Sequence, residues 1–201
     1  SSVLVNRATQ GLYPPGSTFK ILTALEYIRE NPLTYQNYSF DCNGRFTSGE
    51  DTIRCFHGTK HGKVDFTTSF AKSCNSSFAN MGLTLSRTSF EDTLSSLYFN
   101  QSLPVDLTSN ISKVSIGTSS SDSDLIQTVI GQGTTQMTPL HLSMITSMIA
   151  NHGIMMQPYI IDRVESADGN LIKSFSPDSL GQLISEEEAD ILKNLMIAVV
   201  Q

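Results

Sequence analysis

The hydrophobic positions of the chain fall mainly at helical spacing. Residues 19–29 place apolar side chains three or four positions apart, which predicts an amphipathic helix after the turn Tyr13–Gly16. The same criterion predicts shorter helices over residues 76–85 and 89–99. The apolar positions of the first helix are Ile21, Leu22, Leu25 and Ile28.

Two longer helices carry start signals. Thr138 is an N-cap candidate with Pro139 at the first helical position, and the apolar pattern behind them continues to about Asn151. Ser185 and Glu188 have the spacing of a capping box. We therefore expect helices over residues 138–151 and 185–200.

Strand signals are fewer. Tyr159–Val164 and Leu171–Phe175 flank Asp168-Gly169 and predict one β-hairpin, near residues 159–175. The Ser- and Asp-rich stretch Thr118–Asp124 predicts a loop. The expected fold class is α+β, predominantly helical.

Composition narrows the class of protein. The length of 201 residues and the hydrophobic fraction of 39% suit one domain over residues 1–201. The net charge is −6, and the lysines and arginines are scattered along the sequence. A nucleic-acid partner is not expected, because phosphate binding calls for a basic excess or stripe. Apolar runs fall short of the roughly 20 residues of a membrane span, and no signal peptide opens the chain. Because Gln201 interrupts an apolar helical pattern, we expect a piece of a longer protein.

Ser17 and Lys20 are the first residues that suggest chemistry. They lie one helical turn apart at the start of the helix over residues 19–29, so both side chains face the same side. A buried amine loses its proton more easily and can serve as the base that activates a serine. The alternative interpretation is an N-cap serine beside a solvated lysine.

The surrounding motifs favour the catalytic interpretation. In their order and spacing they resemble the transpeptidase domain of class B penicillin-binding proteins, for which Ser-x-x-Lys and Ser-x-Asn are recognised motifs. The resemblance covers nearly the whole chain. The motifs are Asn6-Arg7-Ala8, Tyr13-Pro14-Pro15-Gly16-Ser17-Thr18-Phe19-Lys20, Ser73-Cys74-Asn75, Gly131-Gln132-Gly133 and Met137-Thr138-Pro139-Leu140.

The resemblance implies a role for each matching residue. Ser17 would attack the penultimate D-Ala carbonyl of a peptidoglycan stem peptide, with Lys20 as base. Ser73 would relay a proton to the leaving amine, and Asn75 would hold Lys20 and the substrate amide. A neighbouring stem peptide would resolve the acyl-enzyme into a cross-link, and β-lactams would acylate Ser17. The Gly131–Gly133 stretch would shape the cleft wall, and the reaction needs no metal or cofactor.

The resemblance also implies a setting for the whole protein. Such a protein acts at the extracytoplasmic face of the bacterial cell membrane, with a membrane anchor and a glycan-polymerising membrane partner.

The third family motif, Lys-Thr/Ser-Gly, does not occur after Ser73. In relatives it lies on an edge strand that completes the oxyanion hole, and losing one such donor typically costs about 10²–10³ in rate. We therefore expect a truncated penicillin-binding-protein or serine β-lactamase-like fold that lacks most of the central antiparallel sheet and is nearly inactive. The apolar faces of residues 19–29 and 185–200 would then be exposed and would favour self-association.

Two other functions share some of these motifs. A class D β-lactamase also carries Ser-Thr-Phe-Lys, and a β-lactam sensor domain resembles that class. Asn75 argues against both, because class D enzymes have an apolar residue at that position. Fast hydrolysis of penicillin would indicate the former, and a long-lived adduct without cross-linking the latter.

Three cysteines leave their chemistry open. Cys42 and Cys55 would close a small loop as a disulfide, which an extracytoplasmic location permits. All three thiols would otherwise be free, or Cys42, Cys55, His61 and Cys74 would bind zinc, although their spacing matches no compact zinc motif. His141 and His152 are expected to be structural or solvent-facing.

Overall fold

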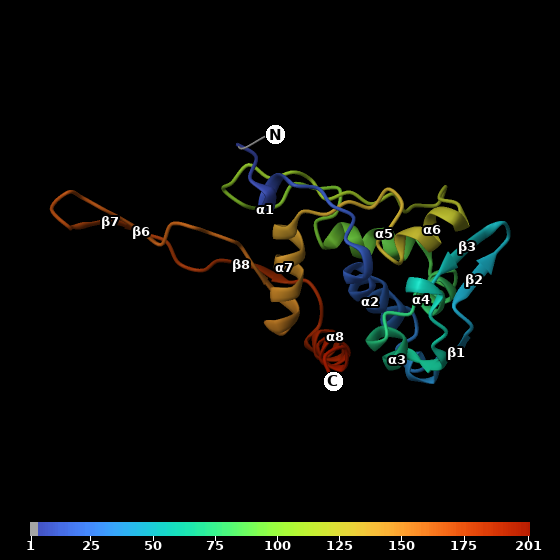
Figure 1. Cartoon of the computed structure of the whole chain (residues 1–201). Helices are drawn as coiled ribbons and strands as arrows, with labels where there is room; N and C mark the ends of the chain where they lie inside the picture. Colours follow the sequence, from blue (N-terminus) through green and yellow to red (C-terminus); the bar gives the residue numbers. More distant parts are fainter. Residues whose placement is uncertain (1–3) are drawn as a thin grey trace.

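Helices joined by short antiparallel strand pairs make up the protein, whose computed structural model describes residues 4–201 (Figure 1). Every helix in this range is too short or too polar to span a membrane. The helices are α1 (Arg7–Gln10), α2 (Lys20–Glu30), α3 (Phe66–Ala71), α4 (Asn75–Gly82), α5 (Arg87–Ser96), α6 (Asp122–Thr128), α7 (Pro139–Ala150) and α8 (Glu186–Ala198). The strands are β1 (Ser39–Cys42), β2 (Arg45–Ser48), β3 (Asp51–Arg54), β4 (Gly62–Asp65), β5 (Ile154–Met156), β6 (Arg163–Glu165), β7 (Leu171–Ser174) and β8 (Ser179–Gln182).

Helix α2 forms the centre of the core. It contacts α4, α5 and α8, and nearly all of its side chains are buried, including the predicted apolar positions. Just before it, Phe19 packs edge-on against Phe99 and beside Phe90. The expectation that the apolar face of residues 19–29 is exposed is therefore wrong, because α4, α5 and α8 cover it.

The exposed apolar side chains of helix α8 are confined to its C-terminal end and the residues just after it. Its inner face is buried against α2, α3 and α7, whereas Ile197, Val199 and Val200 are exposed. Self-association through this end remains a prediction, which solution scattering can test.

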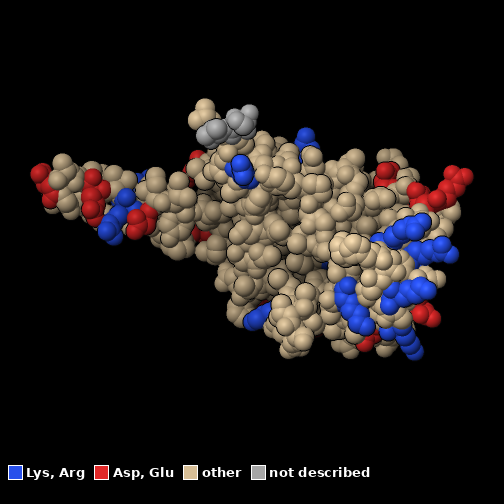
Figure 2. Space-filling view, viewed as in Figure 1, with Lys and Arg blue, Asp and Glu red and all other residues tan. Residues whose placement is uncertain are grey.

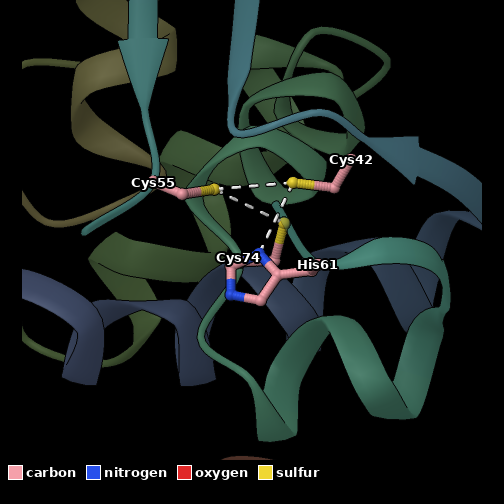
Figure 3. A group of neighbouring side chains, drawn as sticks. All are labelled: Cys42, Cys55, His61 and Cys74. Atoms are coloured by element: carbon pink, nitrogen blue, oxygen red, sulfur yellow. Dashed lines mark hydrogen bonds between the residues drawn. The ribbon is translucent and has the colours of Figure 1, made fainter. Parts of the chain in front are cut away.

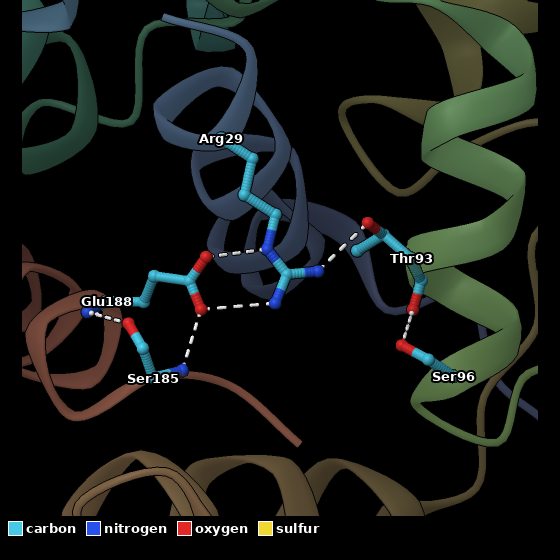
Figure 4. Close-up of polar contacts among 5 residues, drawn as sticks. All are labelled: Arg29, Thr93, Ser96, Ser185 and Glu188. Atoms are coloured by element: carbon cyan, nitrogen blue, oxygen red, sulfur yellow. Dashed lines mark hydrogen bonds and ion pairs between the residues drawn. The ribbon is translucent and has the colours of Figure 1, made fainter. Parts of the chain in front are cut away.

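A charged side chain joins three helices at the α2–α8 contact (Figure 4). The Nε and Nη2 atoms of Arg29 in α2 donate to the two carboxylate oxygens of Glu188 in α8, at 2.6 and 3.1 Å. Its Nη1 donates to Thr93 of α5 at 3.0 Å. Glu188 also completes the predicted capping box with Ser185. One carboxylate thus starts α8 and fixes it to α2.

The other predicted helices are present with small shifts of their ends. Thr138 caps α7 and Pro139 is its first residue, as predicted. Three short helices, α1, α3 and α6, were not predicted, since helices of four to seven residues carry too little periodicity. The predicted loop Thr118–Asp124 is partly wrong, because Ser121 starts α6 with a capping box to Asp124.

Strands are more numerous than predicted. The hairpin near residues 159–175 is confirmed as β6–β7, although its strands are shorter, with Gly169 in the turn at φ +79°. Three further antiparallel pairs, β1–β4, β2–β3 and β5–β8, were missed. Strands of three or four residues show no clear alternation, so their pattern does not distinguish them from loops.

Among the described residues, the β5–β8 pair lies beside α7, and the other strand pairs lie towards the two ends of the molecule (Figure 1). The β6–β7 hairpin projects from the helical body as an arm, and the β2–β3 hairpin lies at the opposite end (Figure 1). On the face shown in Figure 2, charged side chains of both signs gather at these two ends, and the body between them is largely uncharged.

Candidate active site

Ser17 lies in a 3₁₀ turn, Gly16–Phe19, that leads directly into α2. The turn is fixed by a backbone contact, in which Gly16 N donates to Gly131 O at 2.9 Å. Gly131 has φ +70°, and a Cβ on it would lie 2.1 Å from Gly16 O, so only glycine fits there. Gly131 therefore supports the backbone that carries Ser17, and Gln132 of the same stretch lines the cleft described below.

Lys20 is the first residue of α2, and its side chain is 2% exposed. Its Nζ donates to Ser73 O at 2.8 Å, Ser73 Oγ at 2.9 Å and Asn75 Oδ1 at 2.7 Å, and lies 3.3 Å from Ser17 Oγ. An ammonium has three protons for these four oxygens. The contact with Ser17 is the longest and is the one a neutral amine would make as an acceptor.

Burial lowers the pKa of Lys20 from its usual 10.5 to about 8, and the nearby Cys74 and Cys55 act in the opposite direction. At pH 7, roughly one lysine in ten would then be neutral, compared with roughly one in 3,000 at the usual pKa. Burial at this site therefore raises the neutral fraction of Lys20 at pH 7 by roughly 300-fold. The predicted buried amine beside a serine is present.

Ser73 and Asn75 come from the connection between α3 and α4. Ser73 has φ +49°, a conformation that is rare for a serine and is held by hydrogen bonds from Ser73 N to Phe70 O and from Cys74 N to Ser69 O. This backbone conformation directs both the hydroxyl and the carbonyl of Ser73 towards the Lys20 amine. Ser73 Oγ also donates to Ser17 Oγ at 2.8 Å. Asn75 starts α4 and donates through Nδ2 to Arg54 O at 3.0 Å.

A cleft of about 500 Å³ opens beside these residues. Ser17, Ser73 and Asn75 line it. A second, apolar cleft of about 330 Å³ also reaches Ser17. The remaining lining residues of the first cleft are Phe56, Thr59, His61, Lys72, Ile130 and Gln132, and those of the second include Thr18, Ile21, Phe70, Met196 and Val199.

All four predicted site residues therefore meet at one point, although they come from two segments, residues 17–20 and 73–75, that are more than fifty residues apart in the sequence. The carbonyl of Arg54, which orients Asn75, was not predicted, because no side-chain pattern marks a backbone acceptor. His141 is buried in α7 with its Nε2 on Leu97 O at 2.7 Å and does not line either cleft, and His152 is exposed, as expected.

A hydroxyl bonded to a buried, partly neutral amine is the arrangement of a serine nucleophile with a lysine base. The chain belongs to the penicillin-binding protein transpeptidase domain family, whose family model matches residues 2–201.

Relatives and solved structures agree with this family. The chain is 27% identical over 203 residues to peptidoglycan D,D-transpeptidase PbpA of Mycolicibacterium smegmatis, covering all of this chain and 41% of the relative. It superposes with a TM-score of 0.89 on penicillin-binding protein A from M. tuberculosis in an imipenem acyl-enzyme complex, at 26% identity, covering 98% of this chain and 46% of that one. For the D,D-transpeptidase domain from Eggerthella lenta the TM-score is 0.88, at 28% identity, with coverage of 100% and 52%. The chain thus spans about two fifths of the curated relative and about half of the solved chains.

Proposed function

We propose that this chain carries the nucleophilic part of a serine D,D-transpeptidase that cross-links peptidoglycan stem peptides ending in D-Ala-D-Ala and is acylated by β-lactams. The contact network of Lys20 with Ser17, Ser73 and Asn75 carries the proposal. The names of the relatives support the substrate class, and the imipenem complex of one of them supports the ligand. The corresponding location is the cell envelope.

Acylation begins when neutral Lys20 accepts the proton of Ser17 Oγ. The oxygen then forms a bond to the carbonyl carbon of the penultimate D-Ala, and the carbonyl oxygen becomes an oxyanion. When the C–N bond breaks, the proton passes from Lys20 through Ser73 Oγ to the leaving amine of the last D-Ala. The products are a Ser17 ester and free D-Ala.

Transfer to the acceptor reverses these proton movements. An amine of a neighbouring stem peptide attacks the ester carbonyl and gives its proton to Ser73 and Lys20. The C–O bond breaks, Ser17 Oγ recovers a proton, and the new amide is the cross-link. With a β-lactam the ring nitrogen is the leaving group and stays tethered to the acyl group.

The oxyanion requires N–H donors that are already in position. The backbone N–H of Ser17, at the start of the 3₁₀ turn, is one candidate donor. The resemblance assigns the second to a strand bearing Lys-Thr/Ser-Gly, a motif that residues 74–201 do not contain. We therefore propose that β-lactams acylate Ser17 of these 201 residues about 10²–10³-fold more slowly than they acylate a protein with all three motifs.

Incubation with a fluorescent penicillin, followed by peptide mapping, tests the proposal. The adduct should form on Ser17. Its rate of formation should be slower than that of penicillin-binding protein A from M. tuberculosis by the factor given above. Ser17→Ala should abolish it, and Lys20→Ala should reduce it by at least about 10²-fold, since the general base contributes about 10²–10⁴. Thr18→Ala is the matched control, because its hydroxyl is bonded to Pro15 O and lies outside the network of Lys20.

An adduct on another residue, or one that forms equally well without Lys20, would contradict the proposed mechanism. A rate equal to that of the three-motif protein would contradict the role given to the third motif. Fast turnover of penicillin would instead indicate a β-lactamase.

A further inference from the structure

Three thiols and one imidazole converge at the start of α4 (Figure 3). Cys42 ends β1, Cys55 follows β3, His61 precedes β4, and Cys74 is the N-cap of α4. All three cysteines are buried, and their cluster is separate from the main hydrophobic core. The sequence spacing is regular but long, with twelve, five and twelve residues between successive members.

The distances among these atoms match a tetrahedral site. Cys42 Sγ lies 3.6 Å from Cys55 Sγ and 3.4 Å from His61 Nδ1, and Cys55 Sγ lies 3.8 Å from Cys74 Sγ. All four ligand atoms lie within 4.8 Å of one another. With Zn–S bonds of about 2.3 Å and Zn–N bonds of about 2.0–2.1 Å, a tetrahedral ion sets neighbouring sulfurs about 3.8 Å apart and sulfur and nitrogen about 3.6 Å apart.

The other two interpretations of the cysteines explain less. All three are free thiols in the structure, so the Cys42–Cys55 disulfide is not formed. A disulfide at any pair would leave the third sulfur and the imidazole unexplained. Three unligated thiols would explain why the cysteines are buried. They would not explain why Nδ1 of His61, which comes from the turn before β4, lies among the sulfurs.

The segment that supplies three of the ligands has almost no core of its own. Across residues 39–65 the buried side chains other than Cys42 and Cys55 are Ile53 and Val64. Its two turns meet closely at Gly44, where a Cβ would lie 2.5 Å from Gly58 O. A segment this small usually needs a disulfide or a metal to hold its shape. A metal at the cluster would join both strand pairs to the start of α4.

We propose that Cys42, Cys55, His61 and Cys74 bind one zinc ion as a structural Cys₃His site. The ligand set favours zinc because soft thiolates with one imidazole in tetrahedral geometry suit this ion, and four protein ligands leave no open position for catalysis. Two contacts at the sulfurs support bound thiolates: Ser77 N donates to Cys74 Sγ at 3.4 Å, and Ser76 Oγ lies 3.1 Å from Cys55 Sγ. Because Cys74 stands between Ser73 and Asn75, the same ion holds the second catalytic motif in place.

Metal analysis of the whole chain, purified with zinc and a reductant, is the direct test. We expect one zinc per chain by mass spectrometry, and the intense visible bands of tetrahedral cobalt thiolate after exchange with Co²⁺. His61→Gln should weaken zinc binding, measured by chelator competition, by more than the roughly 10–100-fold that loss of an outer-shell partner causes. His57→Asn is the matched control: His57 is an exposed histidine of the adjacent turn with φ +51°, which asparagine tolerates.

The metal content of the unsubstituted chain decides the question even if a variant does not fold. Metal-free protein with three reactive thiols, or a Cys42–Cys55 disulfide in peptide maps, would overturn the proposal. So would equal loss of zinc from His57→Asn and His61→Gln.

Hydrogen exchange tests the link to the catalytic motif separately. Zinc removal should raise exchange in residues 39–65 and 73–77 and leave α7 unchanged; no change in residues 73–77 would refute that link. None of these measurements requires the protein to be a transpeptidase.

Discussion

Lowering the pH from 7.5 to 5 should destabilise the fold through one buried imidazole, that of His141. Its side chain is fully buried in α7 and packs beside Phe99, with ring centroids 4.7 Å apart. Because Nε2 lies 2.7 Å from the carbonyl oxygen of Leu97, Nε2 carries the proton of the neutral ring. Within residues 4–201, Nδ1 has no hydrogen-bond partner. A second proton would therefore place both a charge and an unpaired donor in the core.

The size of the effect follows from the pKa. Burial lowers the pKa of His141 from 6.5 to about 4, and the hydrogen bond to Leu97 opposes this only in part. Between these two values the unfolded chain binds the proton and the folded chain does not, so stability falls as the pH falls. The free energy of unfolding should drop by about 2 kcal/mol at pH 5 and by about 3 kcal/mol once the pH is below 4.

Urea denaturation at a series of pH values measures this loss. His141→Gln retains an N–H donor for Leu97 O without a titrating ring, so its stability should lack the drop between pH 7.5 and 5. Subtracting the two curves removes contributions shared by both proteins, including those of the cysteine cluster and of Glu26, whose pKa burial raises. His152→Gln, at an exposed histidine that contacts Glu186, is the control and should keep the drop. An unchanged slope in His141→Gln would refute the reasoning.

Two further substitutions test contacts that position the site. Gly131→Ala should lower the free energy of unfolding, measured in urea, by at least about 1–3 kcal/mol and should slow acylation of Ser17, because its Cβ would strike Gly16 O. Gly49→Ala is the control for backbone strain alone, since Gly49 has φ +58° and nothing lies within 4 Å of an added Cβ. Glu188→Ala should cost about 2–3 kcal/mol, since it removes a partly buried ion pair together with the capping-box bond in which Ser185 N donates to the Glu188 carboxylate. Glu187→Ala on the same turn should change stability by less than about 0.5 kcal/mol, and equal losses for these two variants would contradict the role given to Arg29.

The residues of the candidate site were predictable because the chemistry proposed for them depends on local spacing. Ser17 and Lys20 are one turn apart in any helical conformation, and the motif around Ser73 identified the second pair of residues. The left-handed backbone of Ser73 was not predictable, since serine rarely adopts it and tertiary contacts impose it.

The parts of the fold that were missed depend on contacts between distant segments. An apolar helix face indicates burial but does not identify its cover, so the burial of α2 beneath α8 could not be read from residues 19–29. The strands β1, β2, β3 and β4 are too short to show a hydrophobic period. They form because β1 pairs with β4 and β2 pairs with β3. The convergence of the cysteines likewise exists only in three dimensions, because it brings together the ends of four elements.

The four oxygens around the Lys20 amine have a consequence for the proposed reaction. A proton can leave or reach this nitrogen without any side chain rotating, because every partner it exchanges with is already in contact. Water around a free lysine would have to reorient each time the charge changed, whereas the dipoles here are fixed by two helix starts and one strained loop. The folding of the chain, completed before substrate binds, has already supplied that reorganisation.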